Sequence, residues 1–84
     1  MNKNNSLAVF IKKWRSSKAL SLNAAAKISG IPQSTISSYE MNRVSPTMEN
    51  QKRLAVTLQV QLTDIIDMAE YDKNTRIKNK QKDQ

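Results

Sequence analysis

Residues 28–40 read I-S-G-I-P-Q-S-T-I-S-S-Y-E, and this stretch decides the fold. Gly30 is the only glycine of the chain, and Pro32 follows two residues later. Glycine supplies the left-handed backbone that ends a helix, and proline fits at or just before the first turn of the next one. The stretch therefore predicts a tight turn between two helices, the second of which runs from Pro32 to about Met41.

This second helix has two unlike faces. At about 100° per residue, Ile36 and Tyr39 share the side of Pro32. The opposite face carries only amide and hydroxyl side chains, those of Gln33, Ser34, Ser37 and Ser38. A solvent-facing helix ordinarily carries Lys, Glu and Arg. Short groups that both donate and accept hydrogen bonds suit base edges in the major groove of DNA, and we interpret this face as one that reads bases.

Apolar residues recur at spacings of three and four along most of the chain, without the alternation typical of strands. The pattern predicts an all-α fold with helices at about 7–17, 22–29, 32–41, 48–58 and 62–71. Asn5 or Ser6 is predicted to cap the first helix, Ser21 the second and Thr47 the fourth. Ile28, Met48 and Ile66 are among the side chains expected to face the core.

The pattern also divides the chain. Residues 1–5 are predicted to be a flexible N-terminus, and residues 6–71 form the single folded domain. Residues 72–84 are basic and carry one apolar side chain, Ile77, so we expect a disordered tail.

Composition excludes several classes of protein. The chain has no cysteine and no histidine, so it lacks thiolate metal ligands, the commonest metal ligand and the usual general base. A domain of 84 residues has a small core and little room for a deep pocket. We therefore expect no enzyme activity, no metal and no cofactor. No membrane-spanning run or secretory signal is present in the sequence, and a cytoplasmic protein is expected.

The net charge of +7 is unevenly distributed. Residues 1–21 carry five Lys or Arg and no acid, whereas residues 62–72 carry four acids and no Lys or Arg. Residues 73–84 are basic again. A basic body indicates a polyanionic partner such as nucleic acid, although charge alone is equally consistent with a soluble Lys-rich protein.

Two runs of residues carry a family resemblance. The first is Leu20-Ser21-Leu22, Ala25-Ala26, Ser29-Gly30-Ile31, Ser34-Thr35-Ile36-Ser37 and Glu40. The second is Pro46, Met48, Leu54-Ala55, Leu58, Val60, Leu62 and Asp64-Ile65-Ile66. Together they resemble the helix-turn-helix and the following two helices of the lambdoid Cro and repressor proteins, the XRE-type family. The resemblance covers about residues 7–68 and implies a five-helix, lambda-repressor-like DNA-binding domain.

The resemblance also implies roles for individual residues. Bases are read by the polar face of the third helix, at Gln33, Ser34, Ser37 and Ser38. Phosphates are contacted on either side of it, at Lys18, Ser21, Leu22, Asn23, Met41, Asn42 and Arg43. Arg15 and Glu40 occupy the positions of a structural ion pair, the alternative being a loose surface pair. Asn42 and Gln59 stand where relatives commonly have glycine.

The implied function is that of a sequence-specific transcriptional regulator of double-stranded DNA. The simplest form is a homodimeric repressor on a pseudo-palindromic operator. Its dimer surface is expected at Gln59, Val60, Gln61, Leu62, Met68 and Tyr71. The alternative is an antitoxin-type DNA-binding protein whose tail or fifth helix binds a partner protein.

Overall fold

The computed structural model describes residues 6–82, with side chains described as far as Lys78. Over that range the chain is all-helical and contains no strand, which confirms the predicted fold class. The helices are α1 (Leu7–Ser17), α2 (Leu22–Ser29), α3 (Gln33–Glu40), α4 (Met48–Leu58) and α5 (Leu62–Lys82). The predicted flexible N-terminus, residues 1–5, lies outside the described residues.

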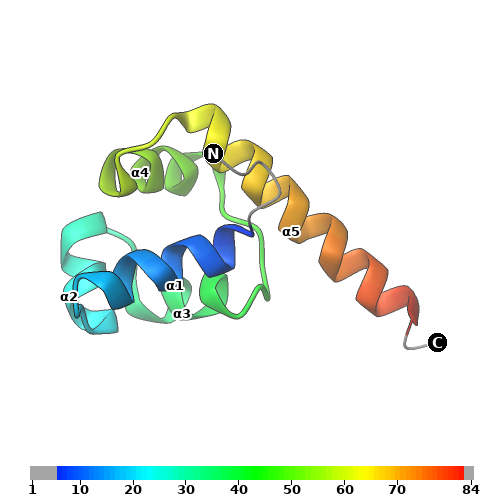
Figure 1. Ribbon diagram of the computed structural model, residues 1–84, viewed down its shortest axis with the longest axis horizontal. Helices are drawn as coiled ribbons and strands as arrows, with labels where there is room; N and C mark the ends of the chain where they lie inside the picture. The colour runs from blue at the N-terminus through cyan, green and yellow to red at the C-terminus, as the bar shows by residue number, and fades with distance from the viewer. Residues whose placement is uncertain (1–5, 83–84) are drawn as a thin grey trace.

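The helices pack around one core. In Figure 1, α1 and α3 lie together in the lower part of the molecule, α2 at one end and α4 above them. α1 packs against α3 and α5, α2 against α3 and α4, and α4 against α5. α5 starts beside α4 and projects past the other helices, so that the molecule measures 39 × 25 × 23 Å. Within the described part of the chain, no helix is both long and apolar enough to cross a membrane.

The core receives side chains from every helix and from the turn between α2 and α3. The largest fully buried ones are Leu7, Ile11, Ile31 and Ile65. Three predicted core residues are exposed instead, Ile28 to 57%, Met48 to 52% and Ile66 to 36%. On α2 the neighbouring Ser29 is buried in place of Ile28. Met48 is the first residue of α4, at the rim of the core. Ile66 follows Ile65 by one residue, or about 100° of helix, and only one of these neighbours faces inward.

Three helices begin where the sequence predicts. Ser6, Ser21 and Thr47 are the N-cap residues of α1, α2 and α4. Their side-chain oxygens accept hydrogen bonds from the backbone N–H groups three residues on, at 3.3, 3.0 and 3.2 Å. Each bond satisfies a donor that the first turn of a helix leaves free, which explains the positions of these helix starts.

The predicted end of the last helix near Tyr71, with a disordered tail after it, is wrong. α5 continues to Lys82. The carboxylate of Asp72 is buried and accepts a hydrogen bond of 2.8 Å from the backbone N–H of Ala8. Arg76 donates to Asn42 Oδ1 at 2.7 Å. Polar contacts rather than apolar anchors therefore hold the first turns of the extension.

Two left-handed positions predict substitutions with opposite signs. Gly30 has φ of 75° and Ala19 has φ of 54°. A Cβ at Gly30 would meet only Arg53 Nε at 3.9 Å, so backbone strain alone opposes it. We expect Gly30→Ala to lower the free energy of unfolding by about 1 kcal/mol, because a side chain disfavours this conformation. Ala19→Gly should raise it by roughly 0.5 kcal/mol after the entropy of the unfolded glycine is included. Urea unfolding measures both, and changes of the same sign would contradict the explanation.

Candidate nucleic-acid interface

The turn between α2 and α3 is fixed by both polar and apolar contacts. Gly30 donates its backbone N–H to Ala26 O at 2.8 Å and turns the chain with its positive φ. The Oγ of Ser29 accepts from the N–H of Ile31 at 3.2 Å, and the Ile31 side chain is buried. The two helices are therefore held in a defined relative orientation, as a helix-turn-helix requires.

α3 is anchored on one side and free on the other. Ile36 and Tyr39 are buried, and the Tyr39 hydroxyl accepts a hydrogen bond of 2.9 Å from Asn50 Nδ2 of α4. On the opposite face Gln33 and Ser34 are exposed, and Ser37 and Ser38 are half-exposed. The structure thus brings the four predicted base-reading side chains onto one accessible surface.

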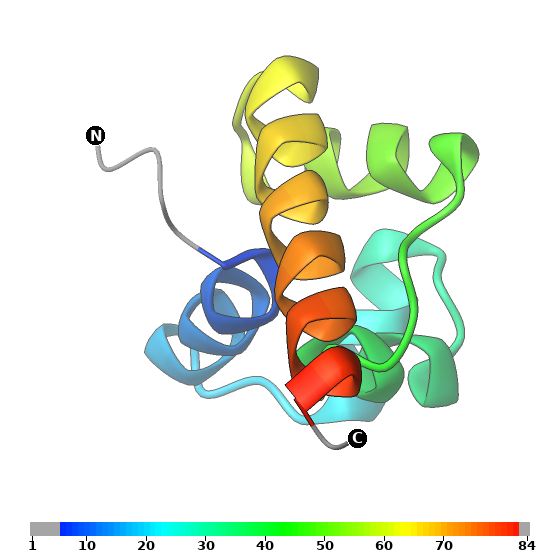
Figure 2. The ribbon, with the colours of Figure 1, turned by 90° about the vertical axis from the view of Figure 1, so that its right-hand side faces the viewer.

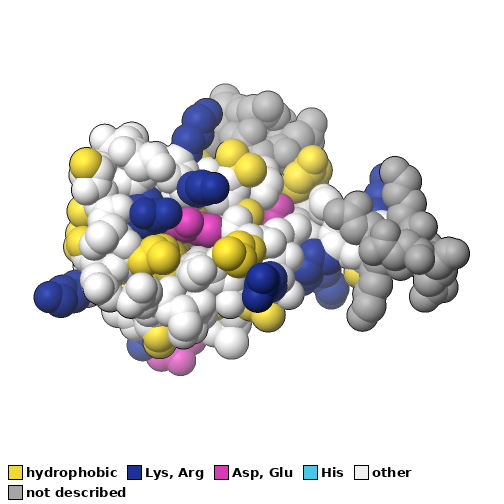
Figure 3. Space-filling model, turned by 90° about the horizontal axis from the view of Figure 1, so that it is seen from below, with side chains coloured by type: hydrophobic (Ala, Val, Ile, Leu, Met, Phe, Trp, Pro, Cys, Tyr) yellow, Lys and Arg dark blue, Asp and Glu magenta, His cyan; other side chains and the backbone are white. Residues whose placement is uncertain are grey.

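The surroundings of this face are basic. Figure 3 shows the side of the molecule that lies below in Figure 1, where Lys and Arg side chains are spread around a broad uncharged area and acidic side chains appear at only a few places near its borders. Lys18 ends α1, and Arg43 follows α3; both are exposed. Neutral groups on the helix with cations around it match a surface that reads bases and holds phosphates.

The predicted phosphate contacts fall into two groups. Lys18, Ser21, Asn23, Met41 and Arg43 are exposed beside the ends of α2 and α3. The predicted contact at Leu22 is made by its backbone; its side chain packs against the core, and its backbone N–H lies at the start of α2.

The side chain of Asn42 is bound within the protein. It has φ of 54°, as expected for the residue that ends the α3 turn, but its side chain is bound to α5. Its Nδ2 donates to Asp72 O at 3.2 Å, and its Oδ1 accepts from Arg76 Nη1 at 2.7 Å. Both ends of the amide are bound to α5, and the phosphate contact expected of the loop at Asn42 stays a prediction.

Arg76 therefore positions the loop after α3, a role that the sequence analysis missed. It also donates to the hydroxyl of Ser45, so that it holds the loop after α3 at two points. Figure 2 shows this loop running alongside α5. The one local signal was the spacing of Asp72 and Arg76, four residues apart with the acid first, which is typical of a continuing helix.

The predicted ion pair between Arg15 and Glu40 is confirmed. Arg15 Nε lies 2.7 Å from Glu40 Oε2, and its Nη2 lies 3.0 Å from Oε1. Its remaining Nη1 donates to Leu20 O at 3.0 Å. The side chains are only 20% and 8% exposed, and the hydrogen bond that Arg15 donates to Glu40 raises the pKa of Arg15. This pair fixes the C-terminal end of α3 to α1 and to the segment before α2.

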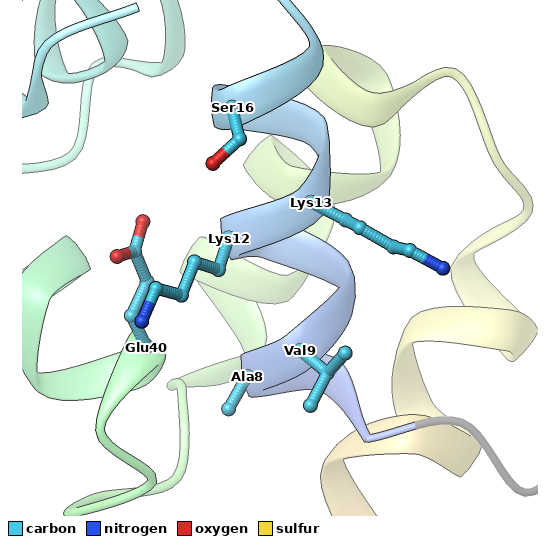
Figure 4. A pocket seen from close by; sticks show the side chains of 6 residues that line it. All are labelled: Ala8, Val9, Lys12, Lys13, Ser16 and Glu40. Carbon is cyan, nitrogen blue, oxygen red and sulfur yellow. The ribbon is translucent and has the colours of Figure 1, made fainter.

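An open hollow of about 400 Å³ lies beside this pair (Figure 4). Lys12 reaches across it toward Glu40, and the Ser16 hydroxyl points the same way, whereas Lys13 points to the other side of α1. Positive charge on α1 therefore extends to the end of α3. The residues that the structure describes contain no cluster of His, Cys, Asp or Glu that fits a metal ion.

The predicted dimer residues do not form one surface. Gln59 and Gln61 are exposed, but Val60 and Leu62 pack against the core. Tyr71 is 44% exposed. Met68 is only 3% exposed, and the prediction that it lies on a dimer surface is wrong, because it faces the core beside Ile65.

Comparison with known proteins agrees with this geometry. A helix-turn-helix family model matches residues 11–65, from α1 to the first turn of α5. Searches of curated proteins and of solved structures found no match. The matched segment is more than half of the chain and contains the turn at Gly30 and the Arg15–Glu40 pair. The chain therefore belongs to the XRE-type helix-turn-helix family of Cro- and repressor-like DNA-binding regulators.

Proposed function

We propose that this protein is a sequence-specific transcriptional repressor that binds a pseudo-palindromic operator as a homodimer, with α3 in the major groove. The observation that carries the proposal is the accessible, uncharged face of α3 within basic surroundings. The N-terminal residues of a recognition helix reach base edges, and two copies place two such helices about 34 Å apart on DNA. Such a repressor would act in the cytoplasm by excluding polymerase from the operator.

The proposed contacts of each side chain follow from its length and its position. Gln33 is the first residue of α3 and is exposed, so its amide is suited to the paired donor and acceptor of adenine. Ser34, Ser37 and Ser38 are shorter and accommodate several base edges. Lys18 and Arg43 lie at the flanks, where they would neutralise phosphates. Phosphate contacts set position and affinity, while base contacts set sequence.

The alternative, a tail that binds a partner protein, is less well supported, because part of the tail is bound within the domain. Asp72 and Arg76 belong to the segment assigned to that role, and both are bound within the domain. The Asp72 carboxylate binds α1 and Arg76 binds the loop after α3, so neither side chain is free to bind another protein.

Selection of DNA from random duplexes tests the proposed function. We expect the protein to enrich an inverted repeat and Gln33→Ala to lose preference at one position in each half-site. The expected cost there is about 1–3 kcal/mol per contact. Thr63→Ala is the matched control, since Thr63 is exposed in the first turn of α5, away from α3 in Figure 1.

The salt concentration separates the two parts of the proposal. Non-specific phosphate binding weakens steeply with salt, whereas base preference persists as long as binding is measurable. Binding that is strong at low salt but equal for all duplexes would show that the basic surface holds DNA without base reading by α3. The proposed function would then be wrong.

A further inference from the structure

Four exposed side chains form a stripe along α5. Ile66, Glu70, Lys73 and Ile77 follow one another at spacings of four, three and four. At about 100° per residue they fall within an arc of about 60°. Ile66 and Ile77 are 36% and 45% exposed. Apolar residues at both ends with an acid and a base between them are typical of a helix that pairs with another helix.

The order of these four residues is symmetric. When two α5 helices run antiparallel with a two-fold axis between Tyr71 and Asp72, Ile66 of one lies opposite Ile77 of the other. The same register places Glu70 opposite Lys73, and each pair occurs twice. We propose that a second copy of this chain docks on the α5 stripe in this antiparallel register. The inference rests on the homodimer of the proposed function and names its contact surface.

A hollow beside the stripe supports this register. Its volume is about 300 Å³, and it is lined by Ser45, Gln51, Ile66, Ala69, Glu70 and Lys73. The last four are spaced i, i+3, i+4 and i+7, the four positions that form a hole for a side chain of a facing helix. In the proposed register Lys73 of the second copy enters this hole with its methylene stem and brings its ammonium group to Glu70.

Other arrangements fit the residues less well. A parallel pair would place Glu70 against Glu70 and Lys73 against Lys73, and like charges that face each other are destabilising. Tyr71 lies about 120° around α5 from Ile77 and takes no part. The proposed dimer contact therefore lies on the exposed, projecting half of α5 and not on the loop before α5, where the sequence analysis expects part of it.

Exchange of charges tests the pairing. We expect sedimentation over a concentration series to show a reversible dimer of the full chain. E70K and K73E, each alone, should weaken it roughly three- to thirtyfold, because two attractive pairs become repulsive. An equal mixture of E70K and K73E should restore dimerisation, since each unlike pair then forms again. Circular dichroism and thermal unfolding establish that these surface variants fold.

Cysteine cross-linking tests the register, and the absence of native cysteine keeps it free of background. An oxidised mixture of I66C and I77C chains should yield a disulfide-linked heterodimer, because facing positions of packed helices come within disulfide range. I66C alone should not cross-link, since the two copies of this position lie about 16 Å apart along the antiparallel pair at about 1.5 Å per residue. I77C alone is the matched control with the same expectation.

Each remaining result overturns the inference. The inference is wrong if the chain stays monomeric both free in solution and on its selected duplex. It is also wrong if I66C cross-links by itself, or if the equal mixture of E70K and K73E does not dimerise. Its failure is separable from that of the proposed function. If an inverted repeat is selected but the predicted cross-link does not form, the proposed repressor function stands and the α5 contact is wrong. If the cross-linked dimer forms but shows no base preference, the α5 contact stands and the proposed function is wrong.

Discussion

Glu40→Ala is expected to lower the free energy of unfolding by about 3 kcal/mol, because removing one partner of a buried ion pair leaves the other charge unpaired. Glu40 is 8% exposed and accepts two hydrogen bonds from Arg15. After the change Arg15 keeps only its bond to Leu20 O. The estimate is at the low end for buried pairs, since Arg15 retains 20% exposure. DNA binding should weaken as well, because the end of α3 loses its attachment to α1.

Two variants isolate the cause. Glu49→Ala removes an exposed partner of Arg53, four residues away on α4, and should change the stability by less than about 0.5 kcal/mol. The double variant Arg15→Met/Glu40→Leu removes both charges and should recover most of the loss, since it leaves no unpaired charge. Urea unfolding measures all three, and equal effects of Glu40→Ala and Glu49→Ala would contradict the buried-pair explanation.

The pH dependence of this pair has a defined sign. The pKa of Arg15 is raised by the hydrogen bond that its guanidinium donates to Glu40. A cation whose pKa is higher in the folded state contributes stability that is present below its unfolded pKa and is lost only as pH rises through the folded one. The unfolded and the folded pKa of Arg15 both lie above the pH range of ordinary buffers. The difference in stability between wild type and Glu40→Ala is therefore expected to stay constant from neutral to mildly alkaline pH.

Signals that lie close together in the sequence predict most of the fold. Ser21 and Thr47 cap helices because their hydroxyls reach a donor three residues away. Gly30 marks the left-handed turn in the same local way. The accessible face of α3 also follows from local spacing, because Ile36 and Tyr39 determine which side of the helix is buried.

Left-handed positions without glycine are predicted unevenly. Asn42 tolerates a positive φ, and the family resemblance indicates glycine at both Asn42 and Gln59. Ala19 also has a positive φ, but alanine carries no preference for it, and the conformation is imposed by the backbone bonds from Ala19 and Leu20 to Ser16 and Arg15. Where neighbouring structure determines the conformation, the residue type does not indicate it.

The extension of α5 escaped prediction for a different reason. Its supporting contacts join residues far apart in the chain, with Asp72 bonded to Ala8 and Arg76 bonded to Asn42. Hydropathy cannot indicate them because every side chain involved is polar. The sequence analysis places both Met68 and Tyr71 on the dimer surface, but α5 is covered on one side and Met68 is buried there, whereas Tyr71 is exposed.

A chain that ends after Tyr71 is expected to lose about 3–4 kcal/mol of stability, whereas a chain that ends after Lys78 should stay within about 0.5 kcal/mol of the full protein. The shorter chain lacks Asp72, whose buried carboxylate accepts the N–H of Ala8 in the first turn of α1. It also lacks Arg76, which holds the loop after α3. The longer one keeps both.

Asp72→Ala separates the two contributions. It leaves the Ala8 N–H without its partner and removes a negative charge from the start of α1, which together should cost about 2–3 kcal/mol. Asp72→Asn keeps an acceptor and loses only the charge, so it should cost less. Loss of up to 4 kcal/mol is a large fraction of the stability of so small a domain, so thermal unfolding at low urea resolves the series. If the chain ending after Tyr71 were as stable as the full protein, the Asp72 carboxylate would not hold α1, and α5 would end in solution where its apolar pattern ends.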